Sequence, residues 1–287
     1  MRLPAAFLAS AVLSASTMPP TGGLSIAETA RSIQPGELVV LTISTLVQAD
    51  GLRVRAFNRD VPTIHIGPLQ WRALVGIDLD AAAGTYPVAI EARAGSDTLQ
   101  ATHELLVKPR RFPARALRVD EAFVNPPAAM RDRIARETRE LQELWGRSAP
   151  EPQWSDLFVR PVTDPANSRF GTRSVFNGQP RSQHTGADFL SPAGTPIKAP
   201  NAGRVVLARE LYFLGNAVVI DHGQGLFSTL AHLSVIAVHE GDIVSAGRVV
   251  GRVGATGRVT GPHLHWAVRV GAARVDPLSL LALLGGN

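Results

Sequence analysis

The stretch that decides the fold reads GPHLHWAVRV and occupies residues 261–270. Two histidines alternate with a leucine and an apolar-rich segment follows them, which predicts a β-strand over 263–270. In a strand, His263 and His265 point to the same face, with Cβ atoms about 6–7 Å apart. Both imidazoles therefore face one cleft, where a metal ion can bind one of them while the other acts on a ligand of that metal.

A second spacing, His184-Thr185-Gly186-Ala187-Asp188, places an imidazole four positions before a carboxylate. A fully extended segment would hold these two side chains about 13 Å apart, too far to share an ion. The backbone must therefore fold between them, and we expect Gly186 to allow a tight bend. Two imidazoles and one carboxylate, with an open position for water, are typical of a catalytic zinc site. The same donor set also suits a non-haem iron centre.

The amino-acid composition limits the possible metal ligands, fold classes and partners. The 287-residue chain has no cysteine, so a metal site must be built from histidine and carboxylate. Its 45% hydrophobic content excludes disorder, and its 26 glycines and 21 prolines favour a β-rich fold over long helices. The net charge of +5 is scattered along the sequence, which gives no prediction of a nucleic-acid partner. No run of about 18–20 apolar residues is present, so no membrane span is predicted, and the oligomeric state stays open.

Two regions are distinguished in the first third of the chain. Residues 1–20 combine Arg2 with a short apolar run and small residues, which predicts a signal peptide for export. Residues 24–110 contain short β-branched runs, such as 38–43 and 86–90, separated by glycine, proline and aspartate. This spacing predicts an immunoglobulin-like β-sandwich.

The residue pattern changes after position 110. Residues 111–153 form a predicted linker with one amphipathic helix, for which we expect Asn125 as the N-cap and Pro126 as the first residue. The charged residues of this helix are expected to face solvent. From 154 to 287 the chain returns to short β-runs, and we expect no further helix there.

Three segments of this last region resemble, in order and separation, the lysostaphin-like (LytM-type) zinc endopeptidases that cut peptidoglycan peptides. They are HTGADF at 184–189, LAHLS at 230–234 and GPHLH at 261–265. The resemblance extends from near Phe170 to the C-terminus. It implies a mainly β fold in which residues 154–287 form a zinc metallopeptidase domain built on an antiparallel β-sheet groove.

The family's site residues carry over to five positions of this sequence. The resemblance implies that His184, Asp188 and His265 bind one zinc ion and that His232 and His263 form the catalytic pair. Imidazole has a suitable ordinary pKa of about 6.5 for a general base. Either histidine can take the proton of the water, and the other can then stabilise the oxyanion.

The implied function is a zinc-dependent endopeptidase that hydrolyses the peptide cross-links of bacterial cell-wall peptidoglycan. Its substrate would be the peptidoglycan stem peptides, and its location the periplasm, the cell envelope or the medium. The alternative is a non-catalytic peptidoglycan-binding or hydrolase-activating module, as in family members that lack the metal ligands. The export signal and the absence of cysteine favour a periplasmic enzyme and a direct D-alanyl cross-link.

Overall fold

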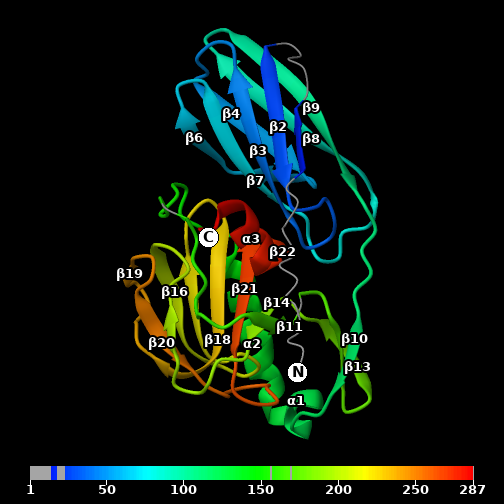
Figure 1. Ribbon diagram of the computed structural model, residues 1–287, viewed down its shortest axis with the longest axis vertical. Coiled ribbons are helices and arrows are strands. Elements are labelled where there is room, and N and C mark those ends of the chain that lie inside the picture. Colours follow the sequence, from blue (N-terminus) through cyan, green and yellow to red (C-terminus); the bar gives the residue numbers. More distant parts are fainter. Residues whose placement is uncertain (1–13, 18–22, 156, 169, 287) are drawn as a thin grey trace, which may run out of the picture.

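The computed structural model describes residues 14–17, 23–155, 157–168 and 170–286 (Figure 1). The chain is mainly β, with mostly antiparallel sheets, which confirms the predicted fold class. The predicted signal peptide, residues 1–20, lies outside the described residues apart from strand β1 (Ser14–Thr17). None of the described helices is long and apolar enough to cross a membrane.

Two facing sheets make up the N-terminal part of the chain. Their strands are β2 (Leu24–Ala30), β3 (Leu38–Thr45), β4 (Gly51–Ala56), β5 (Arg59–Val61), β6 (Thr63–Gly67), β7 (Gln70–Gly76), β8 (Gly84–Ala94) and β9 (Asp97–Val107). One sheet has the order β1-β2-β3-β7-β6 and the other β5-β4-β8-β9. Alternate side chains of β8 and β9 are buried, so each strand turns one face to the shared core. Ile43 and Val75 from one sheet and Val88 and Leu105 from the other belong to that core.

The connecting segment contains β10 (Ala114–Leu117), α1 (Glu121–Val124), the 3-10 turn η1 (Ala128–Met130) and α2 (Arg131–Leu144). The predicted amphipathic helix is α2, but its predicted start at Asn125 and Pro126 is wrong. Asn125 instead ends α1. A second proline, Pro127, follows Pro126 and forces the residue before it into an extended conformation, so the helix cannot begin there.

The C-terminal part is built around a large antiparallel sheet. Its strands are β11 (Ala166–Ser168), β14 (Gly186–Phe189), β15 (Pro196–Lys198), β16 (Gly203–Leu211), β17 (Gly215–Asp221), β18 (Leu226–Ile236), β19 (Ile243–Val244), β20 (Val249–Val253), β21 (Leu264–Val270) and β22 (Ala273–Val275). The main path runs β11-β14-β21-β18-β17-β16-β19. A separate small sheet joins β10 to the hairpin of β12 (Arg173–Phe176) and β13 (Gln179–Gln183). The connecting segment is thus hydrogen-bonded to the C-terminal part through β10.

Helix α2 packs on the large sheet through both apolar and charged contacts. Leu141, Leu144 and Trp145 pack against a cluster that includes Leu211 and Phe227. Glu137, expected to face solvent, is buried: its carboxylate accepts hydrogen bonds from the Tyr212 backbone N–H at 2.8 Å and from Arg133 Nε at 2.6 Å. The expectation of a fully solvated charged face is therefore wrong at this position.

A helix that the sequence does not predict closes the chain. Helix α3 (Pro277–Leu284) has Asp276 as its N-cap, and the Asp276 side chain accepts a hydrogen bond from the Leu278 N–H at 3.0 Å. Pro277 occupies the first helical position, where its missing N–H costs nothing. Because this helix is apolar on nearly every side, it shows no amphipathic period.

The sandwich docks on α3 and on the β21–β22 hairpin through a network centred on Glu37. The side chain of Glu37 is 2% exposed and accepts hydrogen bonds from Arg31, at 2.6 Å, and Arg110, at 3.0 Å. The hydroxyl of Ser279 in α3 donates to the same carboxylate at 2.8 Å. Arg31 also pairs with Asp276 at 2.6 Å. Two buried carboxylates, one from each part, are thus held by one guanidinium.

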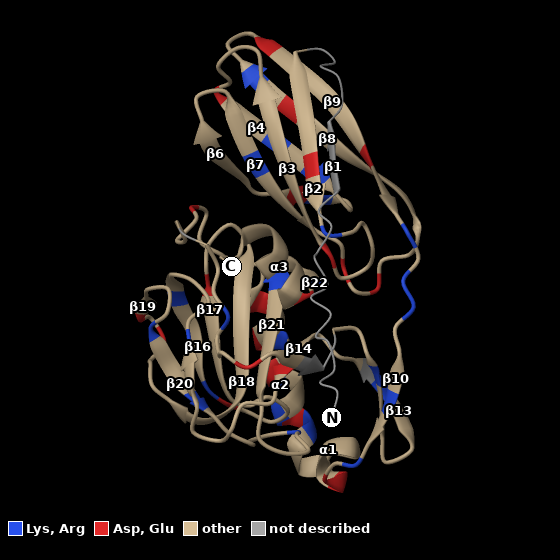
Figure 2. Ribbon diagram, in the orientation of Figure 1, with Lys and Arg blue, Asp and Glu red and all other residues tan. Residues whose placement is uncertain are grey.

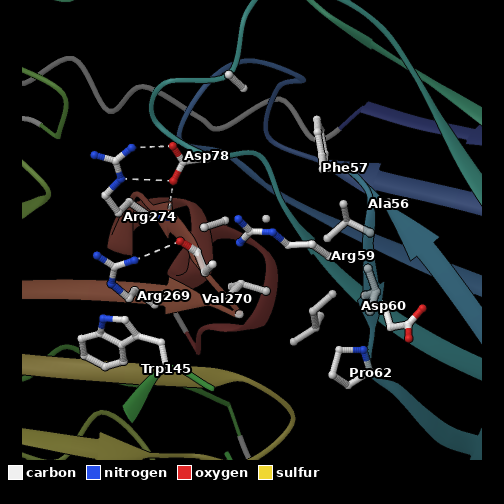
Figure 3. A pocket seen from close by; sticks show the side chains of 18 of the residues that line it. Ala56, Phe57, Arg59, Asp60, Pro62, Asp78, Trp145, Arg269, Val270 and Arg274 are labelled. Carbon is white, nitrogen blue, oxygen red and sulfur yellow. Dashed lines mark hydrogen bonds and ion pairs between the residues drawn. The ribbon is translucent and has the colours of Figure 1, made fainter. Parts of the chain in front are cut away.

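A cavity of about 890 Å³ lies beside this interface, between β5 and β7 of the sandwich and the β21–β22 hairpin (Figure 3). Arg274 pairs there with Asp78 at 2.5 Å and with Asp80 at 2.7 Å, across the two parts. Arg269 stacks on the ring of Trp145 at 5.0 Å. Basic and acidic residues are interspersed over both parts (Figure 2), which agrees with the scattered charge of the sequence.

Replacing Glu37 by alanine should destabilise the docked arrangement by about 3–5 kcal/mol, because two guanidinium groups lose a buried partner. Thermal and denaturant unfolding of the full chain would measure the loss. Asp60→Ala is the matched control, since Asp60 pairs with Arg53 at 3.6 Å while 65% exposed, and such pairs contribute about 0–1 kcal/mol. Equal effects of the two substitutions would contradict the role given to Glu37.

Candidate metal centre

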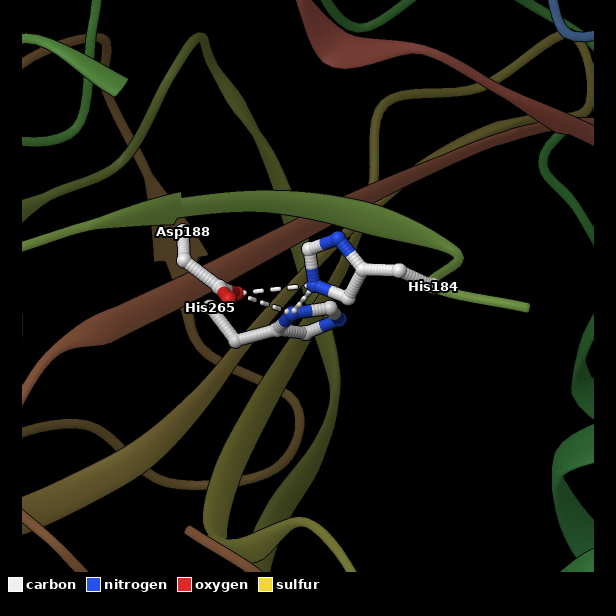
Figure 4. A group of neighbouring side chains, drawn as sticks. All are labelled: His184, Asp188 and His265. Carbon is white, nitrogen blue, oxygen red and sulfur yellow. Dashed lines mark hydrogen bonds and ion pairs between the residues drawn. The ribbon is translucent and has the colours of Figure 1, made fainter. Parts of the chain in front are cut away.

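Two side chains from the neighbouring strands β14 and β21, and a third from the segment just before β14, converge on the C-terminal sheet (Figure 4). Asp188 in β14 lies directly opposite His265 in β21, because these strands pair in antiparallel register. His184 lies just before β14, where its backbone N–H donates to the Thr172 carbonyl at 2.9 Å and its carbonyl accepts from the Gly171 N–H at 2.7 Å. The three residues predicted to bind metal are thus brought together.

The distances between the ligand atoms suit one metal ion. His184 Nε2 lies 2.8 Å from Asp188 Oδ1 and 3.0 Å from His265 Nδ1, and the last two atoms are 2.9 Å apart. Ligands about 2.0–2.1 Å from a tetrahedral zinc ion are separated by about 3.3 Å, so a small expansion admits the ion. One carboxylate and two imidazoles are also the hard and borderline donors that zinc binds in catalytic sites.

The protonation of the cluster agrees with a metal site. Burial raises the pKa of the Asp188 carboxyl, but hydrogen bonds with His184 and His265 outweigh this effect and hold that pKa well below its usual range. Burial lowers the pKa of His265. At neutral pH these groups are therefore a carboxylate and a neutral imidazole, the forms that bind metal.

Gly186 serves the site in a way that differs from the prediction. It is the first residue of strand β14 and not a bend, so the expected tight turn at this position is wrong. A Cβ atom there would lie 2.4 Å from the Trp266 carbonyl oxygen and 2.7 Å from His265 Cε1. The absence of a side chain is what allows β14 to approach the His265 ring closely.

The two histidines predicted to be catalytic flank the cluster. Nδ1 of His232 lies 2.9 Å from the Thr256 carbonyl, and Nδ1 of His263 lies 2.9 Å from the Gly261 carbonyl. Since a carbonyl oxygen only accepts, each Nδ1 carries a proton, and in the neutral form of each ring Nε2 has the lone pair. His263 Nε2 is 3.8 Å from Asp188 Oδ1, and the His232 and His263 rings are 4.9 Å apart.

His232 has an unusual backbone. Its φ of +67° lies in the left-handed region that residues other than glycine rarely adopt. The Leu214 carbonyl, which accepts a hydrogen bond from the His232 N–H at 2.9 Å, helps to hold this conformation. Burial and the neighbouring His265 and His263 lower the pKa of His232 to about 3. The ring is therefore neutral at neutral pH.

An arginine from the connecting segment also reaches the cluster. Arg115 in β10 places its Nη2 3.5 Å from Asp188 Oδ2, the carboxylate oxygen turned away from His184. A partner of this kind orients a metal-binding carboxylate. The sequence carries no signal for it, because Arg115 belongs to none of the three motifs and lies about 70 residues before the first of them.

His222 is buried away from the cluster. Nδ1 lies 2.7 Å from the Ala202 carbonyl and Nε2 lies 2.9 Å from the Ser228 hydroxyl, and burial lowers the pKa to about 4. Both ring nitrogens are thus used inside the fold. This histidine shows why histidine content alone does not define the site.

Comparison with known proteins establishes the family. A profile described as Peptidase family M23 matches residues 182–277. A crystal structure described as a putative peptidase M23 from Pseudomonas aeruginosa is 34% identical, with a TM-score of 0.67, and the match covers 88% of this chain and 95% of that one. The chain belongs to peptidase family M23. The resemblance predicted from the three motifs is thereby confirmed.

Two curated M23 relatives match the region around the metal centre. One is named DD-carboxypeptidase/endopeptidase Mpg, from Neisseria meningitidis serogroup B, and is 43% identical over 97 residues. The other is named peptidoglycan DD-endopeptidase ShyA, from Vibrio cholerae serotype O1, and is 44% identical over 95 residues. The match covers about a third of this M23 chain, 34% and 33%, and 22% of each relative.

Gly186→Ala should weaken zinc binding by about 10- to 100-fold, because the added methyl group displaces the His265 ring or separates β14 from β21. Competition with a zinc-binding dye would measure the affinity. Gly51→Ala is the control, since no heavy atom lies within 4 Å of a Cβ at that position. A folded Gly186→Ala protein with unchanged zinc affinity would contradict the close-approach explanation.

Proposed function

We propose that this M23 protein is a zinc-dependent endopeptidase that hydrolyses the peptide cross-links of bacterial peptidoglycan. The observation that carries the proposal is the five-residue arrangement itself. His184, Asp188 and His265 converge on one point, and two further imidazoles lie beside them: His263 Nε2 is 3.8 Å from Asp188 Oδ1, and the His232 ring is 5.8 Å from the His265 ring. A binding module would not need those two additional bases, so this arrangement favours hydrolysis over the non-catalytic alternative.

The chemistry divides between the metal and the chain. His184, Asp188 and His265 would hold the zinc ion, whose bound chemistry would be polarisation of the scissile carbonyl and a lowering of the pKa of a bound water to about 7. Nε2 of His232 or His263 accepts the proton of the attacking water. The resulting imidazolium then donates that proton to the amine that leaves as the C–N bond breaks. A hydrogen bond to the oxyanion requires a protonated Nε2, which neither neutral tautomer has.

The relatives support the substrate and the location. A relative named a DD-carboxypeptidase/endopeptidase and another named a peptidoglycan DD-endopeptidase share more than 40% identity around the metal centre, which favours a D-alanyl cross-link between stem peptides. Peptidoglycan lies outside the cytoplasm, so the proposal requires the export that residues 1–20 predict. We place the protein in the periplasm or cell envelope.

The domain division supports a positioning role for the sandwich. We assign residues 24–110 to the sandwich, 111–153 to the linker and 154–287 to the peptidase domain. The sandwich contacts α3 and the β21–β22 hairpin, and this hairpin lies at the Val270 end of β21, whereas His265 lies near the beginning of that strand. This placement favours a sandwich that contacts the peptidase domain away from the metal centre. It does not favour a sandwich that covers the metal centre.

Purified cross-linked muropeptides, incubated with the zinc-loaded protein, should be converted to uncross-linked products that mass spectrometry identifies. A chelator should stop the reaction, and added zinc should restore it, because the water nucleophile depends on the metal. If the protein binds peptidoglycan but releases no new amine with zinc present, the non-catalytic alternative is correct.

Substitutions should distinguish the proposed metal ligands from the proposed catalytic histidines. Asp188→Ala and His265→Ala should lose both zinc and activity, whereas His232→Ala and His263→Ala should keep zinc and lose about 10²–10⁴-fold in turnover, the range for general acid–base groups. Zinc content and kcat would be measured on each variant. His239→Ala, at an exposed turn, is the control. Loss of zinc from the His263 variant would overturn its assignment as a base.

A further inference from the structure

Arg258 is stacked between two aromatic rings beside the proposed catalytic centre. Its guanidinium carbon lies 4.9 Å from the centre of the Phe176 ring and 4.6 Å from that of the Phe213 ring. Phe176 comes from the β12–β13 hairpin and Phe213 from the turn between β16 and β17. Two segments distant in sequence thus each place an aromatic ring against one cationic side chain.

This guanidinium is without a counter-charge in the part of the chain that the structure describes. No carboxylate there lies within ion-pair distance of Arg258, and its side chain makes no hydrogen bond to a described residue. Its half-buried position and the nearby cation Arg181 lower the pKa of Arg258, which remains charged at neutral pH. A partly desolvated cation beside a second cation is a binding position for an anion.

The loop that carries Arg258 also orients His232. Two residues before Arg258, the Thr256 carbonyl accepts the hydrogen bond from His232 Nδ1 at 2.9 Å. The Arg258 backbone N–H donates to the Phe213 carbonyl at 2.9 Å, and the next residue, Leu214, accepts from the His232 N–H. Arg258 is therefore anchored to the same two segments that hold the proposed base.

We propose that Arg258 determines substrate specificity by binding a free carboxylate of the peptidoglycan stem peptide. The N–H groups of the guanidinium make no hydrogen bond to a described residue, and a guanidinium can bind a carboxylate through two parallel hydrogen bonds. This inference rests on the proposed function and names the chemical group that the peptide must present next to the scissile bond.

The test compares one cross-linked muropeptide with the same molecule in which the stem-peptide carboxyl groups are amidated. The wild-type protein should hydrolyse the acid with a kcat/KM about 10- to 100-fold above that of the amide, the range for a charge-assisted hydrogen bond. Arg258→Gln should remove that preference by slowing hydrolysis of the acid alone. Arg258→Lys, which keeps the positive charge but not the planar guanidinium, should keep part of the preference for the acid.

Arg269→Gln is the matched control, because Arg269 is also stacked on an aromatic ring but lies at the far end of β21. It should retain the full preference for the acid. Zinc content and melting temperature of each variant show whether the fold and the metal centre are intact. The inference would be overturned if Arg258→Gln lost activity equally on the acid and the amide, or if it kept the preference for the acid. A wild-type protein with no preference for the acid would also overturn it.

Binding to an inactive background separates this inference from the proposed function. Calorimetry with His263→Ala should show weaker binding of the amide than of the acid, and His263→Ala/Arg258→Gln should bind both alike. If the wild type cleaves neither substrate, the proposed function fails, and this binding comparison still decides whether Arg258 recognises the carboxylate.

Discussion

The antiparallel pairing of β14 with β21 is the constraint on which the site depends. It sets Asp188 opposite His265, so a carboxylate and an imidazole from segments 77 residues apart face one point without any flexible loop between them. Antiparallel pairs directly opposite one another bring Cβ atoms to about 4.5–5.5 Å. Gly186 makes the approach possible, and the backbone of His184 is held by hydrogen bonds to Gly171 and Thr172. A shift of register by one residue would turn both ligands away from each other.

The local patterns were sufficient to predict much of this arrangement. The two-residue period at His263 and His265 predicts a shared face, and both imidazoles do approach Asp188. His263 itself lies just before β21, in a bridge with Gly254. The spacing does not say which ring nitrogen faces the cluster. That choice, Nε2 for His184 and Nδ1 for His265, depends on the tertiary positions of the rings.

What could not be predicted depends on partners distant in sequence. Helix α3 escapes a search for amphipathic periods because it is apolar nearly all round, although Asp276 and Pro277 are a start signal that could have revealed it. Glu137 looks like its solvated neighbours until the Tyr212 N–H is placed beside it. Arg115 and Arg258 differ from the other arginines only through what surrounds them, and those surroundings come from other segments.

The left-handed backbone at His232 lowers the free energy of unfolding of this protein. A residue with a Cβ atom in that region raises the energy of the native state by roughly 1–3 kcal/mol relative to glycine. A sequence optimised for folding alone would therefore carry glycine at 232, and it would lack one of the two imidazoles. The strain is tolerated because β18 is largely buried and hydrogen bonds to the Leu214 and Thr256 carbonyls hold His232 in place. Substitutions that raise the stability of the protein must therefore be sought at other positions, since this strained backbone carries one of the proposed catalytic imidazoles.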